Sequence, residues 1–336
     1  MAEQVKDVYD QSDIRRNFST HFYFQGLNLY ERAIAMTTDP DTIAKLSDSL
    51  IDELVGAVGL PKTKFTHRLG WTLFNKITTS FAHIGAPFNE TTGSDGLPKA
   101  SEICLAHFCD IVKVQGIENI PASGPLLIVT NHPGAYDGLT IFSNLPRKDI
   151  KWISTEIPFL RMLPKLCEHI LFASREDSRN RMVVLRNAIN HMKSGGVLVY
   201  FAAGHRDPDP AVFHGASRAI DGWLDIFDMF FKYIPDLQVL PVIISGCVSS
   251  HWAKHIFTRL RRKQIDQQRL AEFGQVISQL MHPGKIFLTP AVSFGKPLTK
   301  EMLQKEAGDG TILNVVIQRE KLLLRDHCET YGGNAE

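Results

Sequence analysis

The sequence predicts an α/β protein with a mostly parallel central sheet flanked by helices, and a helical N-terminal domain before it. Two observations support this fold class. Apolar residues recur three and four positions apart in the first part of the chain, whereas short continuous apolar runs alternate with amphipathic segments after residue 100. A polar stretch with Gly and Pro, APFNETTGSDGLP at 86–98, separates the two patterns and reads as a linker. We therefore expect domains at 1–98 and 99–336.

The first part, from about Ser12 to Ile84, has the periodicity of amphipathic helices. Its stop and start signals are Asp39 and Pro40, and then Thr63 or Thr66. The helical segments are FYFQGLNLYERAIAM at 22–36, TIAKLSDSLIDELVGAVGL at 42–60 and THRLGWTLFNKITTSFAHI at 66–84.

The second part contains runs whose length and apolar character predict strands buried on both faces. They are PLLIVT at 125–130, KWIST at 151–155, HILFAS at 169–174, VLVYFA at 197–202, VLPVII at 239–244 and KIFLTPAVSF at 285–294. Intervening stretches such as 178–196 predict crossover helices, which parallel strands require. In open sheets of this kind, ligands bind beyond the carboxyl ends of the strands.

Composition excludes several classes of protein. The chain has 336 residues, 44% of them hydrophobic and 22% charged, with a formal net charge of +1, so it is neither disordered nor a nucleic-acid-coating protein. Its apolar runs are much shorter than the roughly 18 residues of a membrane-spanning helix, and the N-terminus lacks the pattern of a secretory signal. We expect a cytoplasmic protein.

The cysteines and histidines do not predict a metal site. The five cysteines are odd in number and form no CxxC pair, which is typical of buried thiols rather than of a disulfide framework or a zinc site. The pair His251 and His255 in HWAKH lacks the glutamate of a zinc-binding HExxH motif.

The stretch NHPGAYDG at 131–138 follows the strand LLIVT and places His132 and Asp137 at its carboxyl end. Pro133 suits the first position of a following helix, whose positive end would favour a neutral imidazole able to accept a proton. Five positions apart, the two side chains meet only if His132 lies outside the regular helix. The pair then forms a general base with an orienting carboxylate. The alternative is a helix cap and a solvent-facing acid.

The stretch NHPGAYDG resembles the His-x4-Asp motif of the glycerolipid acyltransferase superfamily, which includes glycerol-3-phosphate and lysophosphatidate acyltransferases. The resemblance extends over roughly 110–245. It covers the lead-in KVQGIENIPASGPLLIVTNH, a second block HILFASREDSRNR, a third block GGVLVYFAAGHRDP and a fourth block VLPVIIS. Four blocks in order are far more specific than one.

The third block departs from the usual Phe-Pro-Glu-Gly-Thr-Arg of the superfamily. Ala202 and Ala203 stand where Pro and Glu are usual, and His205 replaces Thr. The sequence GHRD at 204–207 looks more like the plastid-type glycerol-3-phosphate acyltransferases, which also have a helical N-terminal domain. What the acceptor is stays open.

The resemblance implies transfer of a fatty acyl group from a thioester, acyl-CoA or acyl carrier protein, to a hydroxyl of glycerol 3-phosphate or a lysophospholipid. His132 would be the base and Asp137 its orienter, and no metal or organic cofactor is expected.

Arg175 and Arg206 follow strands, and their forked donors suit a phosphate group, with Gly204 and His205 beside it. Alternatively, each arginine pairs with its neighbour Glu176 or Asp207. The alternative functions are a thioester or ester hydrolase and a non-catalytic lipid-binding or carrier-protein-binding module.

The segment HWAKHIFTRLRRK at 251–263 combines an apolar stripe, Trp252, Ile256 and Leu260, with basic residues. It lies on the inner face of an anionic membrane, docks an acidic carrier protein, or packs its stripe in the core, which is the usual outcome for such a face. Of the three, packing of the stripe in the core is the one that we favour, and the other two stay open.

Overall fold

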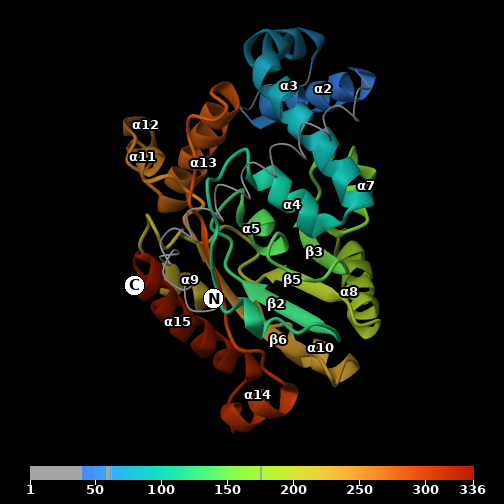
Figure 1. Ribbon diagram of the computed structural model, residues 1–336, viewed down its shortest axis with the longest axis vertical. Coiled ribbons are helices and arrows are strands. Elements are labelled where there is room, and N and C mark those ends of the chain that lie inside the picture. Colours follow the sequence, from blue (N-terminus) through green and yellow to red (C-terminus); the bar gives the residue numbers. More distant parts are fainter. Residues whose placement is uncertain (1–39, 58–60, 62, 175) are drawn as a thin grey trace, which may run out of the picture.

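The computed structural model describes residues 40–57, 61, 63–174 and 176–336 (Figure 1). The helix expected at 22–36 lies outside the described residues. Within them, one seven-stranded sheet has the order β1-β7-β6-β2-β5-β3-β4. Its strands are β1 (Lys113–Gln115), β2 (Leu126–Thr130), β3 (Ile150–Thr155), β4 (Ile170–Ala173), β5 (Val197–Phe201), β6 (Gln238–Ser245) and β7 (Ala291–Phe294).

Five neighbouring strands, from β6 to β4, are parallel, and β7 joins β6 in the antiparallel direction. The predicted mostly parallel α/β fold is therefore confirmed. Each of the first five expected strands is present. The sixth, 285–294, is strand only in its last four residues, and the part before it contributes one isolated bridge, Cys109 to Leu288.

Helices cover both faces of the sheet (Figure 1). They are α2 (Pro40–Ala57), α3 (Lys64–Ser94), α4 (Leu97–Leu105), α5 (Asp137–Phe142), α6 (Pro158–Arg161), α7 (Pro164–Cys167), α8 (Ser178–Lys193), α9 (Ala216–Ile220), α10 (Phe227–Tyr233), α11 (Ser250–Ala253), α12 (Ile256–Arg259), α13 (Gln264–Met281), α14 (Lys300–Ala307) and α15 (Ile312–Tyr331), with a short 3-10 helix at Ile117–Asn119. None of these helices is both long and apolar enough to span a bilayer.

The central strand β2 shows how the layers form. All five of its residues are buried, and the four apolar ones alternate between two apolar clusters. Leu127 and Val129 pack with α8, α10 and α15, whereas Leu126 and Ile128 pack with α3, α4 and α5. Burial of both faces explains why the sequence of this strand is a continuous apolar run.

The stretch 86–98 is not the linker that the sequence predicts. Helix α3, which begins with a capping box at Thr63 and Thr66, continues through Pro87 to Ser94. Buried contacts outweigh the low helix propensity here, because the carboxamide oxygen of Asn89 accepts the backbone N–H groups of Lys165 and Leu166. Residues of α3 share a buried cluster with the sheet. The expected boundary between two domains at residue 98 stays a prediction.

Glu320 on α15 is fully buried near β6, and burial raises the pKa of its carboxyl well above its usual value of 4.5. The folded protein thus keeps a proton that the unfolded chain releases above about pH 4.5, so this group lowers stability as the pH rises. We expect Glu320→Gln to stabilise the protein relative to wild type by up to about 1.4 kcal/mol more for each pH unit between pH 5 and pH 8. Urea unfolding of both proteins at pH 5 and at pH 8 measures this difference in the free energy of unfolding.

The matched control is Glu329→Gln, which changes an exposed glutamate on the same helix. Its effect should be small and independent of pH. A stability difference between Glu320→Gln and wild type that stays constant from pH 5 to pH 8 would show that Glu320 has an ordinary pKa.

Candidate active site

The loop that follows β2 lies at the carboxyl edge of the sheet, between the ends of β5 and β6. Asn131 fixes this loop, because its side chain donates to the carbonyl oxygen of Ile244 at 2.8 Å and accepts from the N–H of Ile244 at 2.9 Å. Helix α5 begins at Asp137, not at Pro133 as the sequence predicts. His132 consequently lies outside the helix, as contact with Asp137 requires.

His132 and Asp137 are hydrogen-bonded, with 2.6 Å between Nδ1 and Oδ2. The carboxylate of Asp137 is buried, and it also accepts the N–H groups of Gly134 at 3.1 Å and Gly138 at 2.6 Å. An ionised carboxylate only accepts, so Nδ1 carries the proton and Nε2 is the basic nitrogen. Because the N–H of Gly134 donates to Asp137, it is not free to stabilise an oxyanion.

The pKa of His132 is raised above its usual value of 6.5. Burial alone would lower it, but the charge of Asp137 and the hydrogen bond to it outweigh burial. This corrects the expectation that a helix dipole would favour the neutral imidazole. The helix is only six residues long and starts five positions after His132, so the carboxylate dominates.

Asp207, in the loop of the third block, is hydrogen-bonded to the loop of the first block. Its carboxylate accepts the backbone N–H of His132 at 2.9 Å, and its own N–H donates to the carbonyl oxygen of His132 at 3.0 Å. Burial raises the pKa of Asp207 to about 6. Because this side chain is turned toward the backbone of His132, the alternative pairing of Arg206 with Asp207 does not occur.

Arg206 instead forms a two-pronged ion pair with Glu272 of α13. Its Nε lies 2.7 Å from Oε2 and its Nη2 lies 2.7 Å from Oε1. The Glu272 carboxylate is almost fully buried, and burial raises its pKa to about 7, although the charge of Arg206 opposes this. No hydrogen bond within the described part of the chain uses Nη1 of Arg206, which leaves that nitrogen for a ligand.

The other residues expected at the site are less constrained. Gly204 has a φ of +65°, a left-handed conformation that favours glycine. His205 is exposed, and its Nδ1 lies 3.0 Å from the carbonyl oxygen of Arg206. Arg175 lies outside the described residues, so its expected role in phosphate binding stays a prediction.

A cavity of about 950 Å³ opens beside His132 and Asp137. Gly204, His205 and Arg206 line it as well, so the structure brings the described site residues to one cavity. Elsewhere its wall is mainly apolar, and its aromatic side chains include Phe81, Phe88, Phe142, Trp152, Phe159 and Phe201. A volume of this size is at the upper end of the usual range for small-molecule sites. The arrangement suits a long apolar ligand with a reactive polar end.

Sequence reasoning missed two residues of α13, Glu272 and Arg269, and gave no role to Arg181, which ends the second block. Both arginines line the cavity. Helix α13 belongs to none of the resemblance blocks, so motif comparison gave no reason to examine it. One signal was available: polar residues recur at 268, 272, 275 and 279, four and three positions apart on one helix face.

Comparison with known proteins gives one match to a family model, that of the Acyltransferase family, at residues 111–245. No curated protein matches the chain. One solved structure that is similar to this chain is that of the 1-acyl-sn-glycerophosphate (LPA) acyltransferase PlsC from Thermotoga maritima. It is 17% identical, the match covers 87% of this chain and 99% of that chain, and the TM-score is 0.40.

Proposed function

From the match of residues 111–245 to the model of the Acyltransferase family, we propose that the protein moves a fatty acyl group from a thioester to a hydroxyl of glycerol 3-phosphate or a lysophospholipid. One observation carries the proposal: the hydrogen-bonded pair of His132 and Asp137, 2.6 Å apart, lies in the wall of a large, mainly apolar cavity. Closeness to the plastid-type enzymes stays a prediction.

In the proposed reaction, Nε2 of His132 takes the proton of the acceptor hydroxyl as its oxygen attacks the thioester carbonyl carbon. The carbonyl oxygen becomes an oxyanion, which the backbone N–H groups of His205 and Arg206 would stabilise, since the N–H of Gly204 donates to the carbonyl oxygen of Phe201. The carbon–sulfur bond then breaks, and the thiolate takes the proton back from the imidazolium. Asp137 holds the ring in the required tautomer and stabilises its charged form. The substrate supplies the nucleophile, so none is needed from the protein.

The apolar wall supports binding of the acyl chain. Phe81 and Phe88 of α3 and Phe159 of α6 provide much of this surface, and Phe81 packs edge-on against Phe159 with 5.1 Å between ring centroids. Removing an apolar chain from water contributes about 0.8 kcal/mol for each buried methylene. The cavity thus favours a fatty acyl group over a short polar one.

Arg206 supports a phosphorylated acceptor. Its Nη1 edge is left for a ligand, it lines the cavity near His132, and guanidinium groups bind phosphate oxygens strongly. Glycerol 3-phosphate carries both groups that this arrangement would recognise, a hydroxyl for His132 and a phosphate for Arg206.

Product analysis tests the proposal. Wild-type protein is incubated with acyl-CoA or acyl carrier protein as donor and with glycerol 3-phosphate, lysophosphatidate or glycerol as acceptor. We expect acylated phosphoglycerides, and a kcat/KM for glycerol at least tenfold below that for glycerol 3-phosphate, because glycerol lacks the phosphate. Release of free fatty acid alone would identify a hydrolase, and binding without turnover would identify a non-catalytic module.

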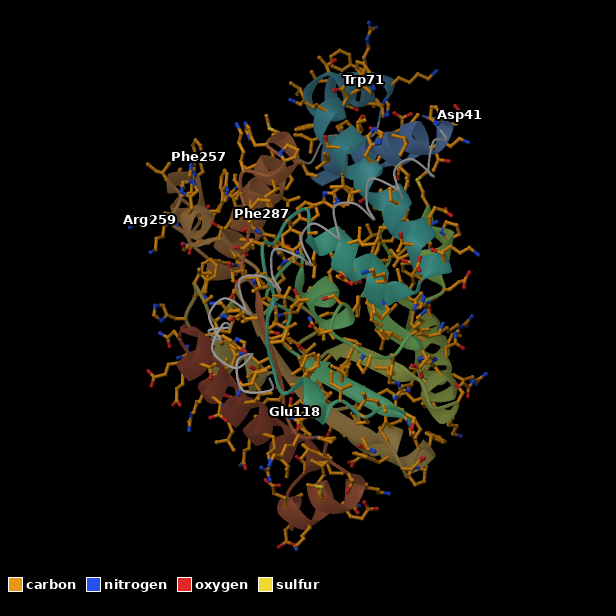
Figure 2. The ribbon with its side chains drawn as sticks, in the orientation of Figure 1. Asp41, Trp71, Glu118, Phe257, Arg259 and Phe287 are labelled. Atoms are coloured by element: carbon orange, nitrogen blue, oxygen red, sulfur yellow. The ribbon has the colours of Figure 1, made fainter. Side chains whose placement is uncertain are left out.

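The segment 251–263 supports contact with an anionic membrane surface. It does not form one helix but the short turns α11 and α12, and the core position expected for Ile256 and Leu260 is wrong, since they are 68% and 72% exposed. Trp252 packs toward α13, near Gly274. Figure 2 shows Phe257 and Arg259 at the outer edge of the molecule, where apolar and basic side chains lie together.

We expect the protein to bind vesicles that contain anionic lipid, and less so at high salt, because each basic residue near such a surface contributes about 1 kcal/mol. Replacing Arg259, Arg261 and Arg262 by Gln should lower vesicle binding at least tenfold in a flotation assay. The control replaces Lys296, Lys300 and Lys305, on or just before α14 at the opposite end of the molecule (Figure 1). Equal losses in both triple variants would mean that 251–263 is not the contact surface.

A further inference from the structure

Helix α13 presents a row of buried polar side chains to the carboxyl edge of the sheet. Gln268, Glu272, Gln275 and Gln279 are all at most 5% exposed. Their spacing places them on one face of the helix. A buried helix face is normally apolar, because burying an amide or a carboxylate costs free energy unless every polar atom finds a partner. These four residues therefore need specific partners.

Several of these partners lie in loops that build the candidate active site. Gln268 donates to the carbonyl oxygens of Pro133 and Asp207, both at 2.7 Å. Gln279 accepts the hydroxyl of Tyr136 at 2.7 Å. The helix thereby links the loop of the first block to that of the third.

The fourth-block loop is held in the same way. Gln275 donates to the carbonyl oxygen of Cys247 at 3.0 Å and accepts the N–H of Ser249 at 2.6 Å. The loops of the first, third and fourth blocks thus all contact α13, although the helix follows the matched residues in sequence.

Glu272 is the charged member of the row. Its two oxygens engage Nε and Nη2 of Arg206, a residue 66 positions away in the sequence. The third block itself has no acid ahead of Arg206, since Ala202 and Ala203 precede Gly204. The acidic partner of this arginine comes instead from a helix that packs over the loop.

We propose that Glu272 is a positioning residue for acyl transfer: it fixes Arg206 in the cavity wall beside His132, with Nη1 directed to the acceptor. This inference rests on the proposed function. The fixed pair prevents Arg206 from turning to Asp137, the nearby carboxylate on which His132 depends. Without the carboxylate at position 272, the guanidinium would compete for Asp137 or move freely.

The charges around His132 support this role. Arg206 lowers the pKa of His132, whereas Glu272 and Asp137 raise it. Glu272 in turn is faced by Arg206, Asp137 and His132. Asp207, on the loop that carries Arg206, also faces His132 and Asp137. Loss of the Glu272 charge therefore leaves Arg206 unbalanced and makes His132 less basic.

The test uses Glu272→Gln in the full-length protein, with Asp266→Asn as the matched control. Asp266 is a half-buried acid on the same helix, and the change removes the same charge without reaching Arg206. The first measurement is the titration of His132 by NMR in the free protein. We expect its pKa to fall by about half a unit or more in Glu272→Gln and to stay unchanged in Asp266→Asn.

The second measurement is steady-state kinetics with glycerol 3-phosphate. Glu272→Gln should raise the KM for this acceptor about tenfold or more, while the KM for the acyl donor changes little. The double variant Arg206→Gln with Glu272→Gln should be no worse than Arg206→Gln alone, because both changes remove one interaction. If Glu272→Gln does not fold, replacing both residues by Met is compared with Arg206→Met on the same criterion.

A folded Glu272→Gln protein with an unchanged His132 titration and an unchanged acceptor KM would overturn the inference. Additive losses in the double variant, or the same effects in Asp266→Asn, would overturn it too. The titration needs no turnover, so it separates this inference from the proposed function, which fails only if wild-type protein transfers no acyl group.

Discussion

His132→Ala should lower the rate of acyl transfer by a factor on the order of 10² to 10⁴, the usual contribution of a general base. The acceptor hydroxyl then loses the imidazole that takes its proton, while the cavity and the loop contacts remain. Binding of the acyl donor should be little affected, because the apolar wall provides most of the contact surface. Single-turnover kinetics with a saturating donor measures the chemical step directly.

The control is His282→Ala, which removes an exposed histidine just beyond α13. It should keep the wild-type rate. Both variants should unfold at similar temperatures, since neither change opens a large cavity in the core. Wild-type turnover by a folded His132→Ala protein would exclude this histidine as the base.

Asp137→Asn should reduce transfer by a similar factor, on the order of 10² to 10⁴, because an amide no longer holds the imidazole in the required tautomer or stabilises its charged form. It should also shift the pH dependence. In wild type the pKa of His132 is raised above 6.5, so activity falls as the pH drops through that raised value. The asparagine lacks the negative charge that raises the pKa of His132 against the effect of burial. The acid limb of the residual activity should therefore move to lower pH.

The measurement is kcat/KM from pH 5 to pH 9 for wild type, Asp137→Asn and Asp236→Asn. Asp236 is an exposed acid that precedes β6, so its replacement should leave the profile unchanged. An acid limb that stays in place in Asp137→Asn would mean that another group governs the pH dependence.

The contact between His132 and Asp137 could be predicted because both residues lie in one short loop after a recognisable strand. Only the short loop between them had to be shaped, and its position after the strand was clear from the sequence. The same reasoning placed the start of α5 too early, at Pro133, since proline suits a first helical turn but does not require one.

Glu272 could not be predicted, because its partner Arg206 is brought near by the packing of α13 over a distant loop. No local rule gives that packing. The spacing of Gln268, Glu272, Gln275 and Gln279 was visible, but a polar helix face usually points to solvent. Only the carbonyl and N–H groups of the surrounding loops explain why this one is buried.

The errors at 86–98 and 251–263 have opposite physical causes. The first stretch has a loop-like composition, but it is helical to Ser94 because Asn89 and its neighbours are buried against the chain near α7. The second stretch has helical periodicity, but it breaks into short turns and leaves Ile256 and Leu260 in solvent. Tertiary contacts decided both cases over local preference.

The fate of a labelled acyl group tests the central claim most directly. Wild-type protein is given a thioester with an isotope-labelled acyl chain together with glycerol 3-phosphate, and the products are resolved by mass spectrometry. The proposed function predicts that the label moves into an ester of glycerol 3-phosphate, and that His132→Ala forms this ester at least a hundredfold more slowly. Label that stays in the thioester, or appears only as free fatty acid, would contradict acyl transfer by this chain.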